Sequence, residues 1–382
     1  MDAFTSEKRW TERFNGVRGL AWLDSNWAGL AVVAVAFVVA AAVSWRKWPD
    51  VIIDFGLQLY LPWRIDQGAM LYRDLHYLAG GPLSQYFNAL LFKIFGVSFR
   101  TLIFANLAIT AALVVLIYRR FLAAADRWTA TTICLGVVLV FAFNEYQVVG
   151  NYNYITPYSH ELFHGLVLSI LAITLLSDWI KKQQMRHVCA AGFCFGLVFL
   201  TKPEVFMALA AGVAVAFVIF YVSRGRVGFV VRSAAAFLAA AVIPVLGFFL
   251  FFLRVEDWRA SVYATAFAWA PLWLTPVAKN PFYLWCTGLD SPAFHLRQMA
   301  IHLLLELGIA PRFAVGDFQI EHQRHQGFRN EAAPEQSEAA PVVGACAQRV
   351  AWLNCHTAFI PELYFASLYE AGDSLDHFDR AR

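Results

Sequence analysis

Seven long apolar runs constrain the fold of this chain more than any other feature of its sequence. They cover roughly residues 26–45, 99–118, 128–146, 158–178, 188–201, 204–222 and 233–253. A helix needs about 20 apolar residues to cross the roughly 30 Å hydrocarbon layer of a bilayer. Because 59% of the residues are hydrophobic and only 15% are charged, the chain does not resemble a soluble domain. We therefore predict an all-α, polytopic transmembrane helix bundle of about seven spans.

Basic residues gather on one side of these predicted spans. They precede the first run and lie in every second connection after it: Lys8, Arg9, Arg13, Arg18, Arg119, Arg120, Arg127, Lys181, Lys182, Arg186, Arg224, Arg226 and Arg232. The positive-inside rule makes that side cytoplasmic, together with the N-terminal segment 1–25. The net charge of +3 is too small to imply a nucleic-acid partner, so the expected surroundings are a lipid bilayer.

The first external loop, residues 46–98, is an exception to this charge pattern because it holds several basic residues. Within it, residues 57–67 and 83–95 have the spacing of amphipathic helices. The second pattern contains Gln85, Asn88 and Lys93 and is too short for a comfortable span. We expect both segments to lie in the membrane interface, as helices that do not cross it.

Beyond about residue 308 the sequence becomes polar, as in the stretch EHQRHQGFRNEAAPEQSEAAP. Such composition is typical of disordered segments or linkers. We therefore divide the chain into a cytoplasmic segment (1–25), a transmembrane domain (26–308) and a polar, partly disordered tail (309–382). The tail is unlike a further span or an external domain, so a truncated or frameshifted end is one alternative.

Several stretches together resemble a known family. The first loop reads PDVIIDFG and then WRIDQGAMLYRDLHYLAGGPLSQYFNALLFKIFG; two spans, the external NYNYITPYSHELFHG and the stretch GLVFLTKPE follow. This order resembles the GT-C superfamily of membrane glycosyltransferases, in particular the protein mannosyltransferase and aminoarabinose transferase branch. The resemblance covers about residues 25 to 305.

The resemblance implies transfer of a sugar from a polyprenyl-phosphate donor to an acceptor hydroxyl of a lipid, glycan or protein. It implies a bacterial inner-membrane protein whose active site faces the periplasm. The catalytic acid of the family stands in the first external loop. Asp54 fits that position best here, and Asp50 is second.

The chemistry explains these residue types. An acceptor hydroxyl needs a base to take its proton, and a leaving lipid phosphate needs a cation to neutralise its charge. Arg64, Arg73 and Lys202 are the candidate phosphate ligands. A divalent cation is the alternative, and no cofactor is firmly implied. The competing interpretations are a surface ion pair between Arg73 and its neighbour Asp74, and a Lys202 side chain that only extends to the headgroups.

The motif His160-Glu161-Leu162-Phe163-His164 has the H-E-x-x-H spacing of many zinc proteases. On a helix, His160 and His164 lie one turn apart and can bind one zinc ion, with Glu161 as the base. A catalytic zinc also needs a third protein ligand. Glu204 is the one acid or histidine at membrane depth between the fifth and seventh spans, so an intramembrane metalloprotease stays an alternative function.

The stretch before this motif favours a sugar site instead. Tyr154 belongs to a run of tyrosines and asparagines at 151–154 that suits carbohydrate hydrogen bonding. We expect His160, Glu161 and His164 to line an external cavity with Asp54, and Glu204 to accompany Lys202 in substrate binding. Helix capping by Ser159 and ordinary packing are the structural alternatives. A non-catalytic, truncated membrane paralogue is the third class of function.

Overall fold

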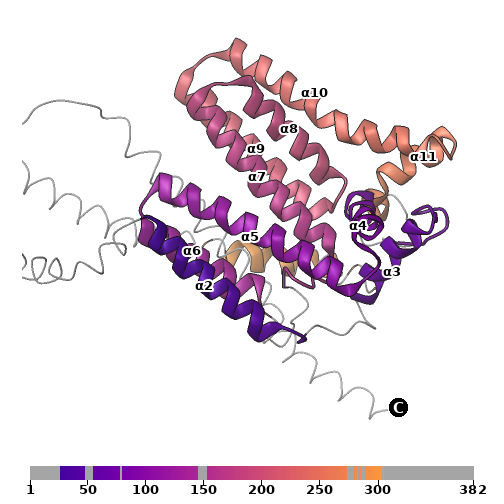
Figure 1. Cartoon of the computed structure of the whole chain (residues 1–382). Helices are drawn as coiled ribbons and strands as arrows, with labels where there is room; N and C mark the ends of the chain where they lie inside the picture. Colours follow the sequence, from indigo (N-terminus) through magenta and orange to yellow (C-terminus); the bar gives the residue numbers. More distant parts are fainter. Residues whose placement is uncertain are drawn as a thin grey trace, which may run out of the picture. The chain divides into compact units, whose positions relative to one another are not determined.

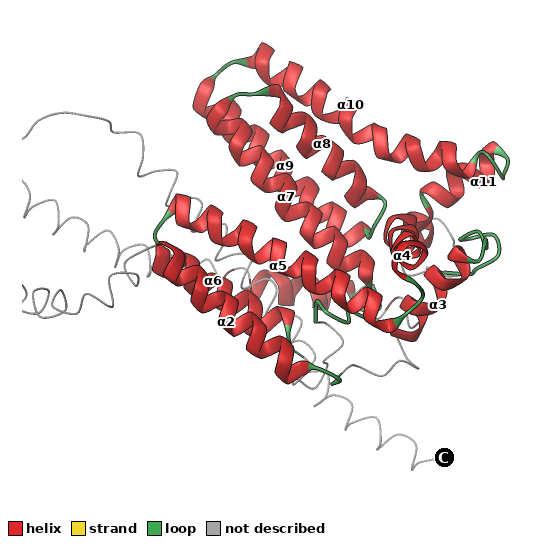
Figure 2. Cartoon of the chain, in the orientation of Figure 1, coloured by secondary structure: helices red, strands yellow, loops and turns green. Residues whose placement is uncertain are grey.

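The computed structural model describes residues 26–47, 55–77, 80–144, 153–272 and 289–302, together with residues 279, 281, 284 and 304. Within these residues the chain consists of helices and the turns that join them (Figure 2). The one exception is an isolated bridge between Leu71 and Leu75. The all-α helix bundle predicted from the sequence is confirmed.

Each of the seven apolar runs is helical in the structure (Figure 1). The elements are α2 (Asn26–Ser44), α5 (Phe99–Ala124), α6 (Arg127–Gly136) with the π-helical η2 (Val137–Ala142), α7 (His160–Lys182), α8 (Met185–Phe199), α9 (Pro203–Arg224) and α10 (Val227–Phe252). Among the described residues, α2, α5, α7, α9 and α10 are long and apolar enough to cross a membrane. The helix formed by α6 and η2, and α8, are apolar but shorter. The protein is therefore an integral membrane protein.

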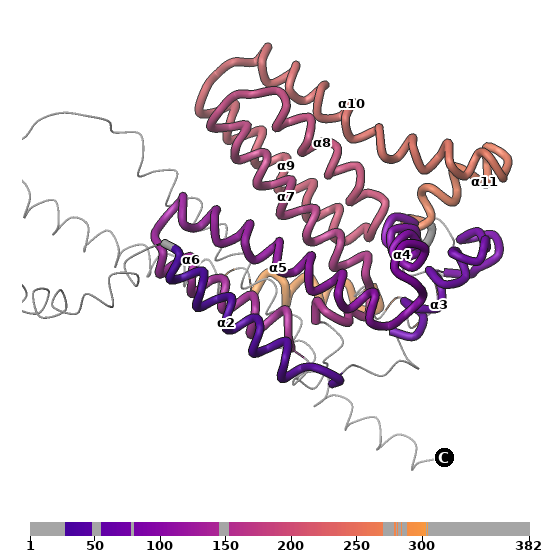
Figure 3. The backbone as a smooth tube through the Cα atoms, viewed as in Figure 1, coloured from indigo at the N-terminus to yellow at the C-terminus, as the bar shows by residue number. Residues whose placement is uncertain are grey.

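Two apolar clusters hold these helices together. The first joins α2, α5, α6 and η2 through residues such as Val33, Leu113 and Cys134. The second joins α7, α8, α9 and α10 around Trp179, whose ring stacks on that of Phe220 with centroids 4.5 Å apart. The tube in Figure 3 follows the chain up and down through this second group, so consecutive helices are neighbours.

Helices α8 and α10 approach each other at two glycines spaced four residues apart. A Cβ atom on Gly192 would meet the backbone carbonyl of Phe237, and one on Gly196 would meet that of Ala241. Small residues at this spacing let membrane helices pack backbone against backbone. The contact brings the C-terminal half of α10 close to α8, which ends beside the candidate site.

The basic turns lie at one end of the helices, as their alternation predicts. Arg120 near the end of α5 forms a two-point ion pair with Asp178 near the end of α7. Arg226 after α9 donates a hydrogen bond to Gln183 after α7, at 3.4 Å. The opposite end, where α7 and α9 begin, is covered by the first loop.

The first loop contains α3 (Phe55–Asp66) and α4 (Pro82–Phe95), close to the two predicted helices. After α10 come α11 (Trp258–Thr265) and the 3-10 helix η4 (Phe267–Leu272). Two polar side chains of α4, Gln85 and Asn88, are buried, at 0% and 1% exposure. The reason is that α4 packs on α7, whose first turn carries polar partners for that face.

The described residues from 279 onward form a separate unit together with 123–126. In this unit the structure describes a helix over 292–302. The predicted N-terminal segment 1–25 and tail 309–382 lie outside the described residues, so the three-part division of the chain stays a prediction.

Candidate active site

The loop that precedes α4 is fastened to the turn between α8 and α9. The backbone N–H of Gly81 donates to the carbonyl of Thr201 at 2.6 Å, and that of Leu83 donates to the carbonyl of Leu200 at 3.2 Å. A Cβ atom on Gly81 would collide with this turn. Because Pro203 occupies the first turn of α9, the chain reverses directly after Lys202. Residues 200–202 thus form a tight turn between α8 and α9.

Glu161 is fully buried beside this fastening, in the first turn of α7. Its Oε1 accepts a hydrogen bond from Nε2 of Gln85 at 2.7 Å, and its Oε2 accepts one from Oγ of Ser159 at 2.9 Å. The hydroxyl of Ser159 also caps the helix, because it accepts from the backbone N–H of Leu162. Gly80 packs directly on the carboxyl side chain, where a Cβ atom would lie 2.6 Å from Cγ. The carboxyl group is thus enclosed by two segments distant in sequence.

His160 is also fully buried, and its neighbours fix its tautomer. Nδ2 of Asn106 lies 3.0 Å from the carbonyl of Ile155, which can only accept, so this amide nitrogen is oriented as a donor. The same nitrogen lies 3.1 Å from Nε2 of His160, which must then accept. The proton therefore sits on Nδ1, which donates to Oε1 of Gln58 at 3.0 Å.

This hydrogen bonding disfavours a zinc site at the H-E-x-x-H motif. Zinc binds an unprotonated ring nitrogen, and in His160 the one lone pair already accepts from Asn106. His164 has Nδ1 3.0 Å from Oγ of Ser84, while its Nε2 has no hydrogen-bond partner within the described chain. No group of three or more histidine, cysteine, aspartate or glutamate side chains in the described residues could hold a metal ion. The motif instead connects helices.

Lys202 points toward the same buried region. Its Nζ donates to the hydroxyl of Tyr158 at 3.2 Å and lies 5.1 Å from the centre of that ring. Burial alone would lower the pKa of Lys202. The Tyr158 hydroxyl and the charges of Glu204 and Glu161 together raise it by more than burial lowers it, so the pKa lies above the usual value. Lys202 is therefore a stable cation whose direct contact is Tyr158 and whose charge also interacts with that of Glu161.

Two tyrosines of the first loop close the region from the other side. The hydroxyl of Tyr77 accepts from Nε2 of Gln58 at 3.1 Å, and that of Tyr72 donates to the carbonyl of Gly80 at 2.8 Å. Burial raises the pKa of both phenols well above the usual value, and the charge of Glu161 raises it further. Both tyrosines stay protonated and can donate hydrogen bonds at neutral pH.

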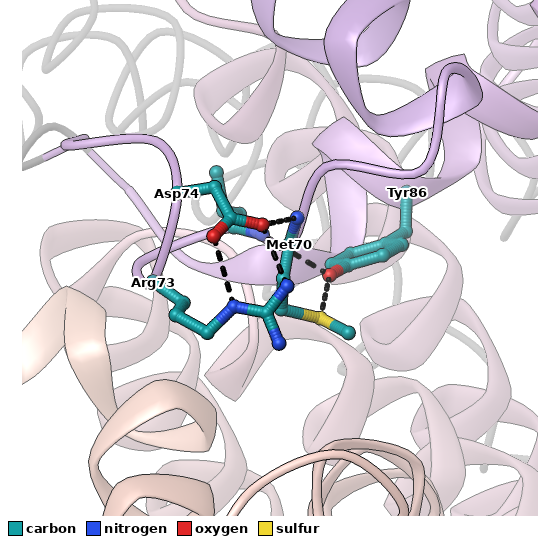
Figure 4. A network of polar contacts seen from close by, with 5 residues as sticks. Met70, Arg73, Asp74 and Tyr86 are labelled. Atoms are coloured by element: carbon teal, nitrogen blue, oxygen red, sulfur yellow. Dashed lines mark hydrogen bonds and ion pairs between the residues drawn. The ribbon is translucent and has the colours of Figure 1, made fainter.

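Arg73 and Asp74 form part of a second polar network, drawn in Figure 4. Asp74 accepts two hydrogen bonds from Arg73, at 2.9 and 2.7 Å, and one from the backbone N–H of Met70 at 2.8 Å. The Arg73 hydrogen bond is the main reason that the pKa of Asp74 falls to about 2. The hydroxyl of Tyr86 lies 3.0 Å from Sδ of Met70 and accepts from the N–H of Leu71 at 3.4 Å.

This network separates two cavities of different character. One has a volume of about 380 Å³ and is almost entirely apolar; its lining residues are Tyr86, Pro244, Gly247, Phe248 and Phe251. The other has a volume of about 350 Å³ and is lined by Tyr72, Arg73, Glu256, Asp257, Ala260, Tyr263 and Ala264. Met70, Tyr72 and Tyr86 belong to one apolar cluster with Phe252 and Ala264, so the two cavities share a wall.

The model of the dolichyl-phosphate-mannose-protein mannosyltransferase family matches residues 79–252. The chain belongs to the GT-C type of membrane glycosyltransferases, in the protein mannosyltransferase-like branch. Searches with this chain gave no match among the curated proteins or the solved structures. The matched range includes Glu161, Lys202 and the residues that line the apolar cavity. The residues that line the polar cavity, Arg73 and Glu256 among them, lie on either side of this range.

The structure brings together only some of the residues predicted for this GT-C site. His160, Glu161 and Lys202 are neighbours, but the two acidic side chains expected beside them, Asp54 and Asp50, lie outside the described residues. His160, Glu161 and His164 are at most 7% exposed and line neither of the two cavities above. Helices α3 and α4 cover them, and the expectation that they line an external cavity with Asp54 stays a prediction, because Asp54 lies outside the described residues.

The remaining predicted residues are dispersed around this centre. Arg73 forms the predicted ion pair with Asp74 and also lines the polar cavity. Arg64 donates to Oε1 of Gln67 at 2.7 Å, within the same loop. Tyr154 stacks on Phe163 with ring centroids 5.2 Å apart, and Glu204 is exposed in the first turn of α9.

The sequence did not indicate which amide side chains hydrogen-bond to His160 and Glu161. In the structure they are Gln58, Gln85 and Asn106. Their partners are 102, 76 and 54 residues away, beyond any local pattern. A signal was present for α4, where Ser84, Gln85 and Asn88 share one helical face. Polar side chains on one face of an apolar helix also indicate a buried polar partner, and here that partner is α7.

Proposed function

We propose that this membrane glycosyltransferase takes its sugar from a polyprenyl-phosphate donor and transfers it to an acceptor hydroxyl, with Asp54 as the general base. We place it in a bacterial inner membrane, with the basic turns in the cytoplasm and the candidate site at the periplasmic face. The observation that carries the proposal is the pair of adjoining cavities, one apolar and one polar.

A polyprenyl-phosphate sugar has an isoprenoid chain and a charged, hydroxyl-rich head, so its binding site needs both surfaces side by side. The apolar cavity between α4 and α10 suits the chain, since aromatic side chains and Gly247 line it. The polar cavity offers Arg73 and two tyrosines to the head. Lys202 is a second cation for the phosphate, held near Glu161.

The reaction that we propose is a direct displacement at the anomeric carbon of the sugar. The oxygen of the acceptor hydroxyl attacks this carbon and forms the new glycosidic bond. The bond from the carbon to the phosphate oxygen breaks, and the polyprenyl phosphate leaves with the electron pair. Asp54 takes the hydroxyl proton, and a neighbouring cation, Arg73 or Lys202, offsets the charge on the phosphate. The configuration at the anomeric carbon inverts.

The first test is a transfer assay on the full chain in membranes, with a panel of radiolabelled polyprenyl-phosphate hexoses and pentoses. Asp54→Asn should lower kcat by about 10²- to 10⁴-fold, the usual contribution of a general base. Asp50→Asn is the matched variant four residues earlier. If it abolishes transfer while Asp54→Asn does not, Asp50 is the base. Absence of transfer by the wild type from every donor contradicts the proposed function.

A second variant tests where the isoprenoid chain binds. A Cβ atom on Gly247 would meet open space, so Gly247→Trp should fill the apolar cavity without disturbing the backbone. We expect an increase in KM for the donor with little change in kcat. Gly228→Trp is the control, because it also points into open space but stands near the other end of α10. Equal KM values for the two variants would mean that the isoprenoid chain of the donor binds outside this cavity.

A further inference from the structure

We propose that His160 is a positioning residue, which holds the first turn of α3 through Gln58 and thereby sets the place of Asp54. The inference rests on the proposed function, because it concerns the general base assigned there. It gives the H-E-x-x-H motif a role that needs no metal ion. It also predicts which of the two ring nitrogens of His160 matters.

The first argument is the position of Gln58 in the chain. Helix α3 begins at Phe55, the residue directly after Asp54. Gln58 stands in the first turn of this helix, since a turn contains 3.6 residues. A side chain that fixes Gln58 therefore fixes the start of the helix that follows Asp54 in the sequence.

The second argument is that His160 contacts this turn at several points. Oε1 of Gln58 accepts from both the backbone N–H and Nδ1 of His160, at 3.2 and 3.0 Å. The ring of Phe55 packs on the imidazole with centroids 5.9 Å apart. Gln58 and Phe55 are 2% and 1% exposed, so water does not compete for these contacts.

The third argument is that His160 is itself held in one orientation. Asn106 of α5 occupies its other ring nitrogen and is anchored on the carbonyl of Ile155. Gln85 of α4 adds a third bond to the same Oε1 of Gln58, at 3.2 Å, and also donates to Glu161. The first turn of α3 is thus tied to α4 and α7 through one amide oxygen, and through His160 to α5. Several buried hydrogen bonds that converge on one atom hold it in a single position, as a positioning network requires.

Two substitutions of His160 separate the roles of its nitrogens. In His160→Asn, the side-chain amide nitrogen lies where Nδ1 was and can still donate to Gln58. In His160→Gln, the longer side chain places its amide group where Nε2 was, so the contact with Asn106 is kept and the side-chain bond to Gln58 is lost. The backbone N–H bond to Gln58 stays in both variants, so the comparison isolates the side-chain bond. Both variants are neutral amides and remove the imidazole, so each is the control for the other.

The experiment measures kcat and KM of the full chain with the polyprenyl-phosphate sugar that the wild type uses. We expect His160→Asn to lose no more than about threefold in kcat. His160→Gln should lose about 10- to 100-fold, the scale of a displacement of about 1 Å, with KM nearly unchanged. Hydrogen–deuterium exchange of residues 55–60 should be faster in His160→Gln than in His160→Asn, although both unfold at similar temperatures.

Equal kcat values in the two variants, or a loss that appears only in KM, would overturn the inference. The exchange measurement also separates this failure from failure of the proposed function. If the wild type transfers nothing from any donor in the panel, the proposed function is wrong. Faster exchange of residues 55–60 in His160→Gln would then still support the anchoring of α3, and equal exchange would exclude it.

Discussion

Two helix interfaces of this protein differ in the residues that form them: one is formed mainly by glycines and the other by polar side chains. Helix α8 packs on α10 mainly through Gly192 and Gly196, which bring one backbone against another; a long hydrogen bond from Oγ of Ser233 to Sδ of Met185, at 3.7 Å, accompanies them. Helices α3 and α4 pack on α7 through a chain of buried amides and one carboxyl group. In a membrane the first kind gains from close packing alone. The second kind must satisfy every polar atom, and in return it fixes a single arrangement.

The glycine contact should be the harder one to change. In Gly196→Ala the new methyl group would collide with the carbonyl of Ala241, which as backbone cannot turn aside. We expect a loss of about 3 kcal/mol in the free energy of unfolding, at the upper end of ordinary overpacking. The measurement is unfolding of the purified protein in detergent, followed by circular dichroism.

Gly212→Ala in α9 is the matched control for this prediction. Its Cβ atom would lie 3.9 Å from Cδ1 of Ile173, an ordinary contact. Alanine also favours a helix by about 1 kcal/mol over glycine, so this variant should be unchanged or slightly more stable. Equal stability of the two variants would show that α8 and α10 do not touch at their backbones.

A substitution in the polar interface between α4 and α7 should lower the free energy of unfolding by less than Gly196→Ala does. Gln85→Leu removes the donor to Glu161 and leaves a buried carboxyl oxygen without that partner. A hydrogen bond to a charged group contributes about 2 kcal/mol, and we expect a loss of that size. The same unfolding measurement applies, with Lys93→Leu on the exposed side of α4 as the control. A loss no larger than that of Lys93→Leu would contradict a buried bond between α4 and α7.

The smallest effect concerns Asp74, whose ion pair is exposed. Its pKa in the folded protein is about 2, below the usual 3.8, mainly because Arg73 donates to it. A lowered pKa means that the charged form is favoured by folding. The stabilisation is therefore complete above pH 3.8 and disappears as the pH falls toward 2.

The measurement is the difference in unfolding temperature between the wild type and Asp74→Asn across this pH range. The difference should be constant at neutral pH and vanish near pH 2. A difference that did not change with pH would mean that Asp74 acts through shape and not charge.

The comparison also explains which parts of the fold the sequence could predict. The apolar helices follow from local runs such as 233–253, and the turn at Pro203 follows from one residue. The buried face of α4 could not be predicted in this way. The sequence around Gln85 looks the same whether its side chain faces lipid headgroups or a carboxyl group 76 residues later in the chain.

The candidate site was predictable to the same limited degree. His160, Glu161 and Lys202 stand out because charged and ionisable side chains are rare in apolar runs. Their chemistry depends on Gln58 and Asn106, which only the packing of α3, α5 and α7 brings to them. The tautomer of His160 depends on the carbonyl of Ile155, which no pattern of side chains could indicate.

The fastening of the first loop to the α8–α9 turn has a consequence for how such a sequence can diverge. Both hydrogen bonds from Gly81 and Leu83 end on backbone carbonyl oxygens, which every amino acid supplies. Substitutions at Leu200 and Thr201 therefore keep the acceptors, whereas Gly81 has no room for a side chain. Lineages that inherit this fold can therefore keep the attachment with other turn residues that fit the buried space of Leu200 and Thr201, as long as the glycine persists.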